Sequence, residues 1–433
     1  MKRALACLAA VALAGAPRAA AAAERFPPPE FTTDYSLPRT IVPSPDSPAW
    51  QYLDTAVLVA ALAAASYLAL VARSRRGIFF LSIFSLLYFG FWRMGCICPI
   101  GAIQNVALAL SDGNYALPAT VAAFFFLPLA FALFFGRAFC AGVCPLGAIQ
   151  DLVLVRGLAV PRWLDGALRF FPRVYLALAV LLAGTASAFV VCEYDPFVAF
   201  FRLSGSSGML LLGGGILVLA MALGRPYCRY LCPYGVLLSW VSRLSRSSVS
   251  IAPETCVECR LCEDACPFGA IEVPEPAPRP RPGARAAVLL LPAVLAAGGW
   301  ALGAAASKGL SLANPTVALA ERVWFEETGA AEGMTEASAA FRATGTPVEA
   351  LYRAAFEARD RVRLGSGAAG AFLGLSLGAS FARIFLPRRG KDYRAHPGDC
   401  LACGRCFLYC PEEHERLKRR GRVVAVEEVT RQL

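Results

Sequence analysis

The sequence predicts an all-α polytopic membrane protein, with about seven transmembrane helices, that also carries a small cysteine-rich α+β domain split between two distant segments. Three observations predict this fold class. Of the 433 residues, 57% are hydrophobic and the mean hydropathy is +0.54, which is too apolar for a set of soluble domains. Several apolar segments reach the roughly 18 residues that a membrane span needs. Most of the 16 cysteines fall in short, repeated spacings, which suits metal ligation in a reducing compartment.

Apolar segments give the candidate membrane helices, and the basic residues between them predict the orientation. The candidates are Thr55–Ala72, Ile78–Trp92, Leu117–Phe135, Val174–Val191, Met209–Leu223, Ala286–Ala306 and Ala368–Leu386. Arginines gather in alternate short loops, beginning with Arg73, Arg75 and Arg76, so the positive-inside rule places these loops in the cytoplasm. The net charge of +11 therefore fits a multi-pass protein of the bacterial inner membrane. Nucleic-acid binding is not expected, because no basic groove interleaved with aromatic residues accompanies the charge.

Composition also divides the chain into segments. Residues 1–23 have the pattern of a secretory signal peptide, and the Pro-rich residues 24–50 predict a periplasmic tether. The other predicted segments are a five-helix membrane domain (51–245), two halves of the cysteine-rich domain (246–275 and 391–433), two further membrane helices (286–306 and 366–386) and a periplasmic helical segment (307–365). Within the last of these, a helix is expected over Val348–Arg363.

One four-cysteine spacing occurs twice outside the apolar segments, as Cys-x2-Cys-x2-Cys-x3-Cys-Pro. The eight cysteines are Cys256, Cys259, Cys262, Cys266, Cys400, Cys403, Cys406 and Cys410. This is the bacterial ferredoxin spacing, in which three thiolates hold one [4Fe–4S] cluster and the fourth reaches the neighbouring cluster. It predicts two clusters on the cytoplasmic side, with Cys410 completing the first and Cys266 the second. A structural zinc site is the alternative.

A second repeat lies within the membrane domain. The stretches 91–104, 135–150 and 224–235 share an arginine, a cysteine pair and a Cys-Pro-apolar-Gly sequence that opens a helix. Proline suits the first helical turn, and a helix N-terminus favours thiolate over thiol. The four cysteines of the second and third copies are Cys140, Cys144, Cys228 and Cys232. We expect them at the cytoplasmic membrane face as ligands of a third cluster, with packing cysteines or a transient dithiol or copper-handling site as alternatives.

The first copy is shortened to Cys96-x-Cys98 and is expected to face the opposite side, as in membrane proteins built from inverted repeats. Cys192, in the stretch Cys-Glu-Tyr-Asp-Pro-Phe, shares that side. Three thiols are one short of a four-cysteine site, so Asp195 or a partner would complete it, or the site is a dithiol. A metal or redox role for Cys96, Cys98 and Cys192 is a further hypothesis.

The cysteine pattern resembles that of the membrane-bound polyferredoxins that accompany periplasmic nitrate and nitrous-oxide reduction. The resemblance rests on the two Cys-x3-Cys-Pro motifs, the stretch from Cys192 to Phe197 and the two ferredoxin motifs. It implies electron transfer between the quinone pool or cytoplasm and periplasmic reductases. The chain departs from that family in three respects. It lacks the large periplasmic flavin-binding domain of the nitrous-oxide branch, it adds the Cys96-x-Cys98 copy, and it separates its ferredoxin halves by two membrane helices.

The expected function is electron transfer by a membrane-bound iron–sulfur protein that serves an oxidoreductase system rather than acting as a stand-alone enzyme. Its partners would be a periplasmic or membrane oxidoreductase and a quinone. No haem is expected, because the chain has only two histidines, His396 and His414, and no Cys-x-x-Cys-His sequence. A copper-handling or oxidase-assembly factor with redox-active clusters is the alternative, since a Cys-x-Cys pair suits Cu(I).

Overall fold

The computed structural model describes residues 48–95, 99–155, 157–158, 160–202, 206–251, 256–274, 282–385 and 393–419. The predicted signal peptide, the tether up to residue 47, Cys96 and Cys98 lie outside these residues. The last part of the second ferredoxin segment, from residue 420, lies outside them as well.

Helices make up almost all of the described secondary structure. In the first half of the chain they are α2 (Pro48–Leu70), α3 (Arg75–Ser85), the π-helix η1 (Leu86–Trp92), α4 (Pro99–Ser111), α5 (Ala119–Phe135), α6 (Ala138–Gly142), α7 (Pro145–Val153), α8 (Arg162–Leu168), α9 (Phe171–Gly184), α10 (Val190–Tyr194) and α11 (Pro196–Arg202). The second half contains α12 (Ser207–Ala222), α13 (Pro226–Tyr230), α14 (Pro233–Ser242), α15 (Leu261–Asp264), β1 (Ile271–Glu272), α16 (Pro282–Ser311), α17 (Pro315–Glu327), α18 (Glu336–Ala343), α19 (Val348–Phe385), β2 (Arg394–Ala395), α20 (Arg405–Tyr409) and α21 (Pro411–Arg419).

Four helices in the described part of the chain are long and apolar enough to cross a membrane: Ala49–Leu70, Trp163–Gly184, Val288–Ser311 and Val348–Ala382. Helices α4, α5 and α12 are shorter apolar helices. The predicted span Ile78–Trp92 is α3 continued by η1, and the prediction missed α4, whose apolar residues follow the Cys-Pro of the first repeat. The structure thus contains several apolar helices of the kind expected for a membrane protein, whereas the total of seven membrane spans stays a prediction.

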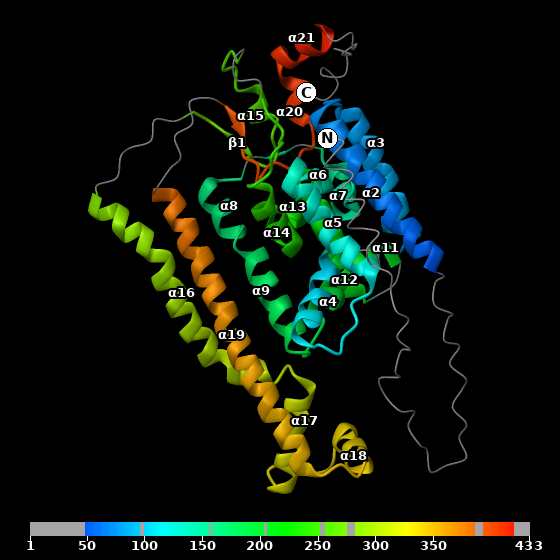
Figure 1. Cartoon of the computed structure of the whole chain (residues 1–433), viewed down its shortest axis with the longest axis vertical. Coiled ribbons are helices and arrows are strands. Elements are labelled where there is room, and N and C mark those ends of the chain that lie inside the picture. Colours follow the sequence, from blue (N-terminus) through cyan, green and yellow to red (C-terminus); the bar gives the residue numbers. More distant parts are fainter. Residues whose placement is uncertain are drawn as a thin grey trace.

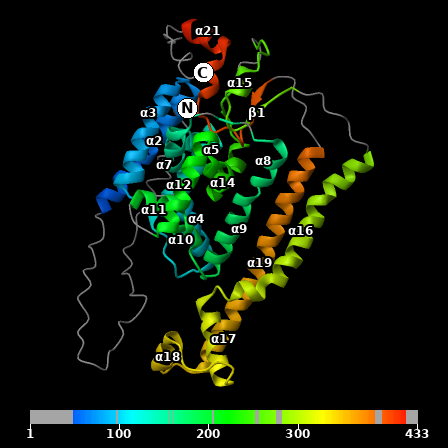
Figure 2. The same cartoon turned by 180° about the vertical axis from the view of Figure 1, so that it is seen from behind.

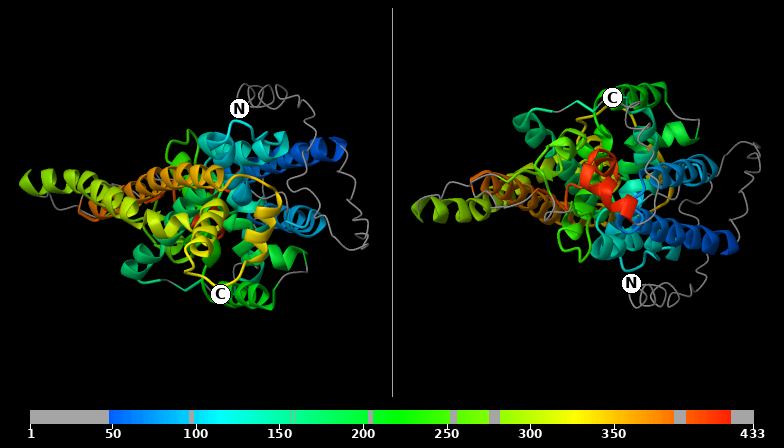
Figure 3. Two further views of the ribbon diagram at one scale, coloured as in Figure 1. Left: turned by 90° about the horizontal axis from the view of Figure 1, so that it is seen from below. Right: turned by 90° about the horizontal axis from the view of Figure 1, so that it is seen from above.

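The membrane helices bury a shared apolar core. Leu62 of α2, Phe131 of α5, Phe197 of α11 and Tyr234 of α14 all belong to one buried cluster. The two ferredoxin segments lie at one end of this bundle, and α17 and α18 lie at the opposite end (Figures 1 and 2). Viewed along the long axis, α16 and α19 project to one side of the bundle (Figure 3).

Helices α16 and α19 run antiparallel and pack closely along their length (Figure 1). A Cβ atom at Gly299 would overlap the Gly370 carbonyl, and one at Gly374 would overlap the Leu295 carbonyl. Such small residues let two helices approach in a membrane. Because these glycines pack against α16 rather than ending the helix, the predicted helix Val348–Arg363 and the predicted span 366–386 are corrected to one continuous helix, α19.

The split cysteine-rich domain forms from segments that are far apart in the sequence. Strands β1 and β2 pair in an antiparallel register, with Ile271 opposite Ala395 and Glu272 opposite Arg394. The short helices α15 and α20 pack against each other. The two segments therefore form a single small α+β unit, which sits on the end of the membrane bundle (Figure 1).

Candidate metal centres

The two ferredoxin loops follow the same backbone course. The residue before the second cysteine has a left-handed φ in both loops, 54° at Glu258 and 52° at Ala402. The residue after that cysteine is also left-handed, with φ of 62° at Arg260 and 74° at Gly404. Non-glycine residues rarely adopt this conformation, so its occurrence at matching positions indicates two equally constrained loops. Each loop leads into a short helix, α15 or α20, that carries the third cysteine.

The first ferredoxin group combines cysteines from both segments. Cys256, Cys259 and Cys262 line one cavity together with Cys410, which lies more than a hundred residues further along the chain. Burial, followed by the nearby thiolate of Cys410, raises the pKa of Cys262 to about 11. The structure thus brings together the four thiols that the crossed ferredoxin pairing predicts.

The second ferredoxin group has the reverse composition, with three cysteines from the second segment and one from the first. Cys400, Cys403 and Cys406 of the second segment lie beside Cys266 of the first segment. Burial raises the pKa of Cys400 to about 12, and the neighbouring thiolates of Cys403 and Cys266 contribute to the rise. The Ala270 N–H donates a hydrogen bond to Cys266 Sγ at 3.4 Å. Such N–H···S bonds are among the features that tune iron–sulfur clusters.

The donor set and its spacing fit an iron–sulfur cluster. In the described residues, no three His, Cys, Asp or Glu side chains converge as the ligands of one metal ion do. A single zinc ion needs four ligands within about 2.3 Å of one point. In a [4Fe–4S] cluster each cysteine binds a different iron atom, and four thiols around one cavity are the donor set that such a cluster needs.

A third group of thiols, the buried thiol site, lies where the second and third Cys-Pro repeats meet. Cys144 and Cys232 each immediately precede a proline that opens α7 or α14. The Gly235 N–H at the start of α14 donates to Cys232 Sγ at 3.3 Å. The site consists of Cys140, Cys144, Cys228 and Cys232. Burial first, and then the proximity of the other three thiols, raises the pKa of Cys144 well above its usual value.

The two repeats exchange their arginines across the buried thiol site. Arg225 is fully buried and donates to the Cys140 carbonyl, while its Nη1 lies 3.1 Å from the Cβ position of Gly147. Arg137 makes the reciprocal approach, with Nη2 at 3.3 Å from the Cβ position of Gly235. The glycine of each repeat thus makes room for the arginine of the other. At Cys228 these two cations offset part of the rise in pKa that burial causes, which acts in favour of the thiolate form that metals bind.

A buried carboxylate ties the buried thiol site to the ferredoxin segments. Asp151 of α7 is 1% exposed and pairs with Arg75 at 2.5 Å, Arg225 at 3.4 Å and Arg405 at 3.2 Å. Burial alone would raise the pKa of Asp151, but the three guanidinium groups outweigh it and lower the pKa well below the usual range. These arginines come from α3, the third repeat and the second ferredoxin segment, so one carboxylate joins three parts of the fold.

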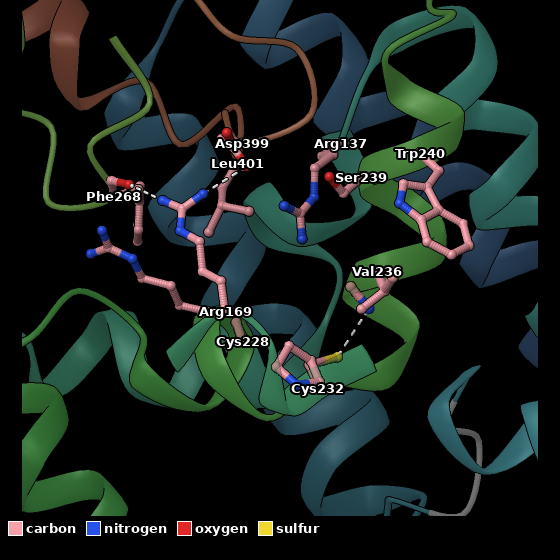
Figure 4. A pocket seen from close by; sticks show the side chains of 13 residues that line it. Arg137, Arg169, Cys228, Cys232, Val236, Ser239, Trp240, Phe268, Asp399 and Leu401 are labelled. Atoms are coloured by element: carbon pink, nitrogen blue, oxygen red, sulfur yellow. Dashed lines mark hydrogen bonds and ion pairs between the residues drawn. The ribbon is translucent and has the colours of Figure 1, made fainter. Parts of the chain in front are cut away.

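A pocket of about 70 Å³ lies between the buried thiol site and the ferredoxin segments (Figure 4). Cys228 and Cys232 line it from the membrane domain, and Phe268 and Leu401 line it from the two ferredoxin segments. Arg169 crosses between them, pairing with Asp399 at 2.8 Å and donating to the Phe268 carbonyl at 3.1 Å. The cysteines of the buried thiol site and of the second ferredoxin group all lie in or against apolar clusters that share Cys400. The two thiol groups are therefore linked by packed protein.

Cys192 is exposed, and its Sγ lies 3.5 Å from Gln104 Nε2 of α4. The Gln104 Oε1 accepts the Val191 N–H at 2.7 Å. The Gly101 Cβ position lies 3.4 Å from the same sulfur. Cys192 therefore packs against the helix that follows Cys96 and Cys98, the two predicted thiols outside the described residues.

Sequence reasoning missed several polar residues around these thiols. Asp151, Gln150 and Gln104 are given no role, and Arg137 and Arg225 are assigned only to the shared motif and to membrane orientation. The available signal was the repeat itself, because Gly-Ala-Ile-Gln follows Cys-Pro and one apolar residue in both of the first two copies. An amide that recurs at a fixed distance from a cysteine pair predicts a shared contact.

Comparisons with known proteins agree with this picture. Two family models match, both described as a 4Fe-4S binding domain: one over residues 117–167 and 207–251, which include the buried thiol site, and one over residues 249–272, which include the first ferredoxin motif. The chain is 32% identical over 125 residues to YccM of Escherichia coli (strain K12), whose name refers to electron transport. It is 32% identical over 123 residues to Protein NirI of Paracoccus denitrificans (strain Pd 1222). No solved structure matches the chain.

These matches support the resemblance to polyferredoxin-like 4Fe–4S membrane proteins that the cysteine spacings predict. The matched stretches are partial. They cover 26% of this chain and 34% of YccM, and 27% of this chain and 18% of NirI. The chain therefore spans about a third or less of the length of these two relatives.

Proposed function

We propose that this protein is a membrane-bound electron-transfer protein that passes electrons between cytoplasmic or quinol donors and a membrane or periplasmic oxidoreductase. Two [4Fe–4S] clusters would be held by the crossed ferredoxin groups and a third by the buried thiol site. The observation that carries the proposal is the continuous arrangement of these three thiol groups. Cys262 of the first ferredoxin group lies near Cys406 of the second. Cys266 and Cys400 of the second group pack against the apolar cluster that contains Cys140 and Cys144.

A bound [4Fe–4S] cluster supplies reversible one-electron chemistry. The chain's own residues would set how readily each cluster accepts an electron. At the second ferredoxin group, the Ala270 N–H to Cys266 stabilises negative charge on sulfur. At the buried thiol site, Arg137 Nη2 lies 3.7 Å from Cys140 Sγ and has the same effect through its charge. Apolar packing around the cysteines excludes water, which protects reduced sulfur and iron from side reactions.

We infer that the protein lies in the bacterial inner membrane with its ferredoxin segments in the cytoplasm. The arginines of the predicted cytoplasmic loops also bind these segments, which supports the inference. Arg75 donates to the Cys403 carbonyl at 3.2 Å, and Arg73 pairs with Glu413 at 2.5 Å. The same residues would therefore satisfy the positive-inside rule and hold the ferredoxin unit on the membrane domain.

The test is cluster counting in anaerobically purified full-length protein. Wild type is expected to contain about twelve iron atoms per chain, from three [4Fe–4S] clusters. Cys410→Ser should lose the spin-resonance signal of one ferredoxin cluster and Cys406→Ser that of the other, each with about four iron atoms. Cys228→Ser should lose only the third cluster. Cys192→Ser is the matched control and should keep the iron content of wild type.

Three outcomes would contradict parts of the proposal. Iron-free, colourless wild-type protein would remove all of it. A Cys410→Ser protein that keeps both ferredoxin signals would refute the crossed pairing. Copper in place of iron at the buried thiol site, lost in Cys228→Ser, would favour a copper-handling or assembly role over electron transfer. Orientation is tested separately, by protease cleavage of the ferredoxin segments in inverted but not in right-side-out vesicles.

A further inference from the structure

One buried amide connects the second and third Cys-Pro repeats. Gln150 of α7 is fully buried. Its Oε1 accepts the Tyr227 N–H at 3.0 Å, and its Nε2 donates to the Leu146 carbonyl at 2.7 Å and to Cys228 Sγ at 3.4 Å. The amide is therefore used on both sides, and one of its donors is aimed at a sulfur of the buried thiol site.

The same contact recurs at the first repeat. Gln104 accepts the Val191 N–H at 2.7 Å and its Nε2 lies 3.5 Å from Cys192 Sγ. In both cases the residue that donates to the amide oxygen immediately precedes the cysteine that contacts the amide nitrogen. Two unrelated stretches of chain, 190–194 and 226–230, are thus held by one side-chain arrangement. The repetition indicates that the glutamine contacts the pair of groups as a unit.

The hydrogen bond from the Tyr227 N–H to the Gln150 side-chain oxygen has a structural explanation. Tyr227 lies in the first turn of α13, where backbone N–H groups lack a partner within the helix. A glutamine oxygen satisfies one of them, as a capping side chain does. Capping of the Tyr227 N–H uses only Oε1, and the Leu146 carbonyl already accepts one hydrogen bond from Nε2. The second Nε2 contact, to Cys228 Sγ, is therefore not needed to cap the helix. Its chemistry suits a thiolate, since an N–H donor stabilises negative charge on sulfur.

We propose that Gln150 is a positioning residue for Cys228 that sets the reduction potential of the metal group at the buried thiol site. This inference rests on the proposed cluster at that site. The hydrogen bond from the Tyr227 N–H to Gln150 Oε1 holds the first turn of α13 against Gln150. It therefore positions the sulfur of the next residue, Cys228, beside the Gln150 Nε2–H. The N–H then stabilises the reduced, more negative state of the cluster and raises its potential. Loss of the N–H therefore lowers the potential.

Two substitutions in the full-length, cluster-loaded protein test this. Gln150→Met removes the N–H donor without adding charge, and Gln150→Glu keeps an oxygen for the Tyr227 N–H while replacing the donor by an anionic acceptor. Both variants are expected to lower the midpoint potential of the third cluster. For Gln150→Met the ratio of oxidised to reduced cluster should change about tenfold, which is 59 mV for one electron. For Gln150→Glu the shift should be larger. The potentials are read by spin resonance during redox titration.

Gln104→Met is the matched control, because it removes the same kind of contact at Cys192 and should leave the third cluster's potential unchanged. A purely structural role predicts a lower melting temperature for Gln150→Met with an unshifted potential, and that result would overturn the inference. If Gln150→Met does not fold, an unshifted potential in Gln150→Glu overturns it equally. Wild type with no metal at the buried thiol site would overturn the proposed third cluster and this inference together, whereas a loaded site with an unmoved potential overturns the inference alone.

Discussion

The buried thiol site and the region around Cys192 are built from the same repeat, yet they differ in how the repeat is surrounded. Both contain a glutamine whose amide nitrogen approaches a cysteine sulfur. The distance is 3.4 Å between Gln150 and Cys228 and 3.5 Å between Gln104 and Cys192. The sulfur is exposed at Cys192 and half-buried at Cys228. Shared backbone geometry is therefore not what distinguishes the two regions.

Charge distinguishes them. In the second and third repeats the motif arginines lie at the cysteines. Arg225 donates to the Cys140 carbonyl of the second repeat. Arg137 approaches Gly235 of the third repeat, and its Nη2 lies 3.7 Å from Cys140 Sγ of its own repeat. The equivalent arginine of the first repeat, Arg93, instead pairs with the buried Asp54 of α2 at 2.8 Å. The repeat thus supplies a fixed position for a sulfur, while the arginines decide whether that position is a cationic site suited to an anionic metal cluster.

The largest effect is expected from the residue after the glutamine, which is Asp151 in the second repeat and Asn105 in the first. Asp151→Asn keeps the shape but removes the carboxylate charge that pairs with three arginines of the buried network. Removing one partner of a buried ion pair costs about 3–5 kcal/mol. We expect a clear fall in melting temperature in detergent and release of the second ferredoxin segment, seen as faster proteolysis there. Asn105→Asp is the matched exchange and should cost less, because Asn105 is only half-buried.

Acid should remove the Asp151 contribution with a defined sign. The pKa of this carboxyl is lowered in the folded protein, because the guanidinium groups of Arg225, Arg75 and Arg405 outweigh the effect of burial. Its stabilising contribution is therefore fully present above the ordinary carboxyl pKa of about 3.9 and is lost as pH falls below that value toward the folded-state pKa. Between pH 5 and 8, roughly the range in which proteins are most stable, the stability difference between wild type and Asp151→Asn should stay constant. A difference that changed across this range would contradict the assignment.

A smaller effect is expected from the motif arginines. Arg137→Gln removes a buried charge that lies 3.7 Å from Cys140 Sγ and donates to the Gly398 carbonyl at 3.1 Å. Loss of a hydrogen bond from a charged group costs about 1.5–3 kcal/mol. Loss of the positive charge should also lower the midpoint potential of the third cluster. The measurements are melting temperature and redox titration.

Arg93→Gln is the control for the arginine variant. It removes the equivalent arginine of the first repeat, which pairs with Asp54. Stability should fall here too, because Asp54 is buried. The potential of the third cluster should not change, and an equal shift in both variants would show that the two repeats are not distinguished by charge.

Sequence spacing was sufficient for features that depend on short-range chemistry. The crossed ferredoxin groups follow from the position of Cys266 and Cys410 relative to their neighbours, because three closely spaced cysteines leave one cluster corner open. The spacing of the Cys-Pro repeats likewise predicted helices α7 and α14 starting at proline. These features need only a few consecutive residues.

Features that depend on distant contacts could not be predicted in this way. Asp151 looked like one acidic residue at the end of an apolar helix, and its three arginine partners come from separate parts of the chain. The sequence predicts a loop helix, Val348–Arg363, and a separate membrane span, Ala368–Leu386, but α19 is continuous through both, and glycines such as Gly374 pack against α16. Whether a helix continues through such glycines depends on which helix packs against them, and a single sequence does not contain that information.

The smallest effect on stability is expected from the glycine of the Cys-Pro-apolar-Gly sequence, which is Gly101 in the first repeat and Gly147 in the second. Substitution by alanine should change the stability in opposite directions, or not at all in the first repeat. A Cβ at Gly147 would lie 3.1 Å from Nη1 of Arg225, which is fully buried and held by the Cys140 carbonyl and Asp151. Because that arginine cannot move away, Gly147→Ala should destabilise by about 1–3 kcal/mol, as overpacking does. Among the residues that the structure describes, a Cβ at Gly101 meets only the sulfur of the exposed Cys192, at 3.4 Å. The higher helix propensity of alanine, up to about 1 kcal/mol, should then make Gly101→Ala neutral or stabilising. Thermal unfolding of both variants in one detergent measures the difference, and destabilisation of equal size in both would mean that the buried arginine does not set the two regions apart.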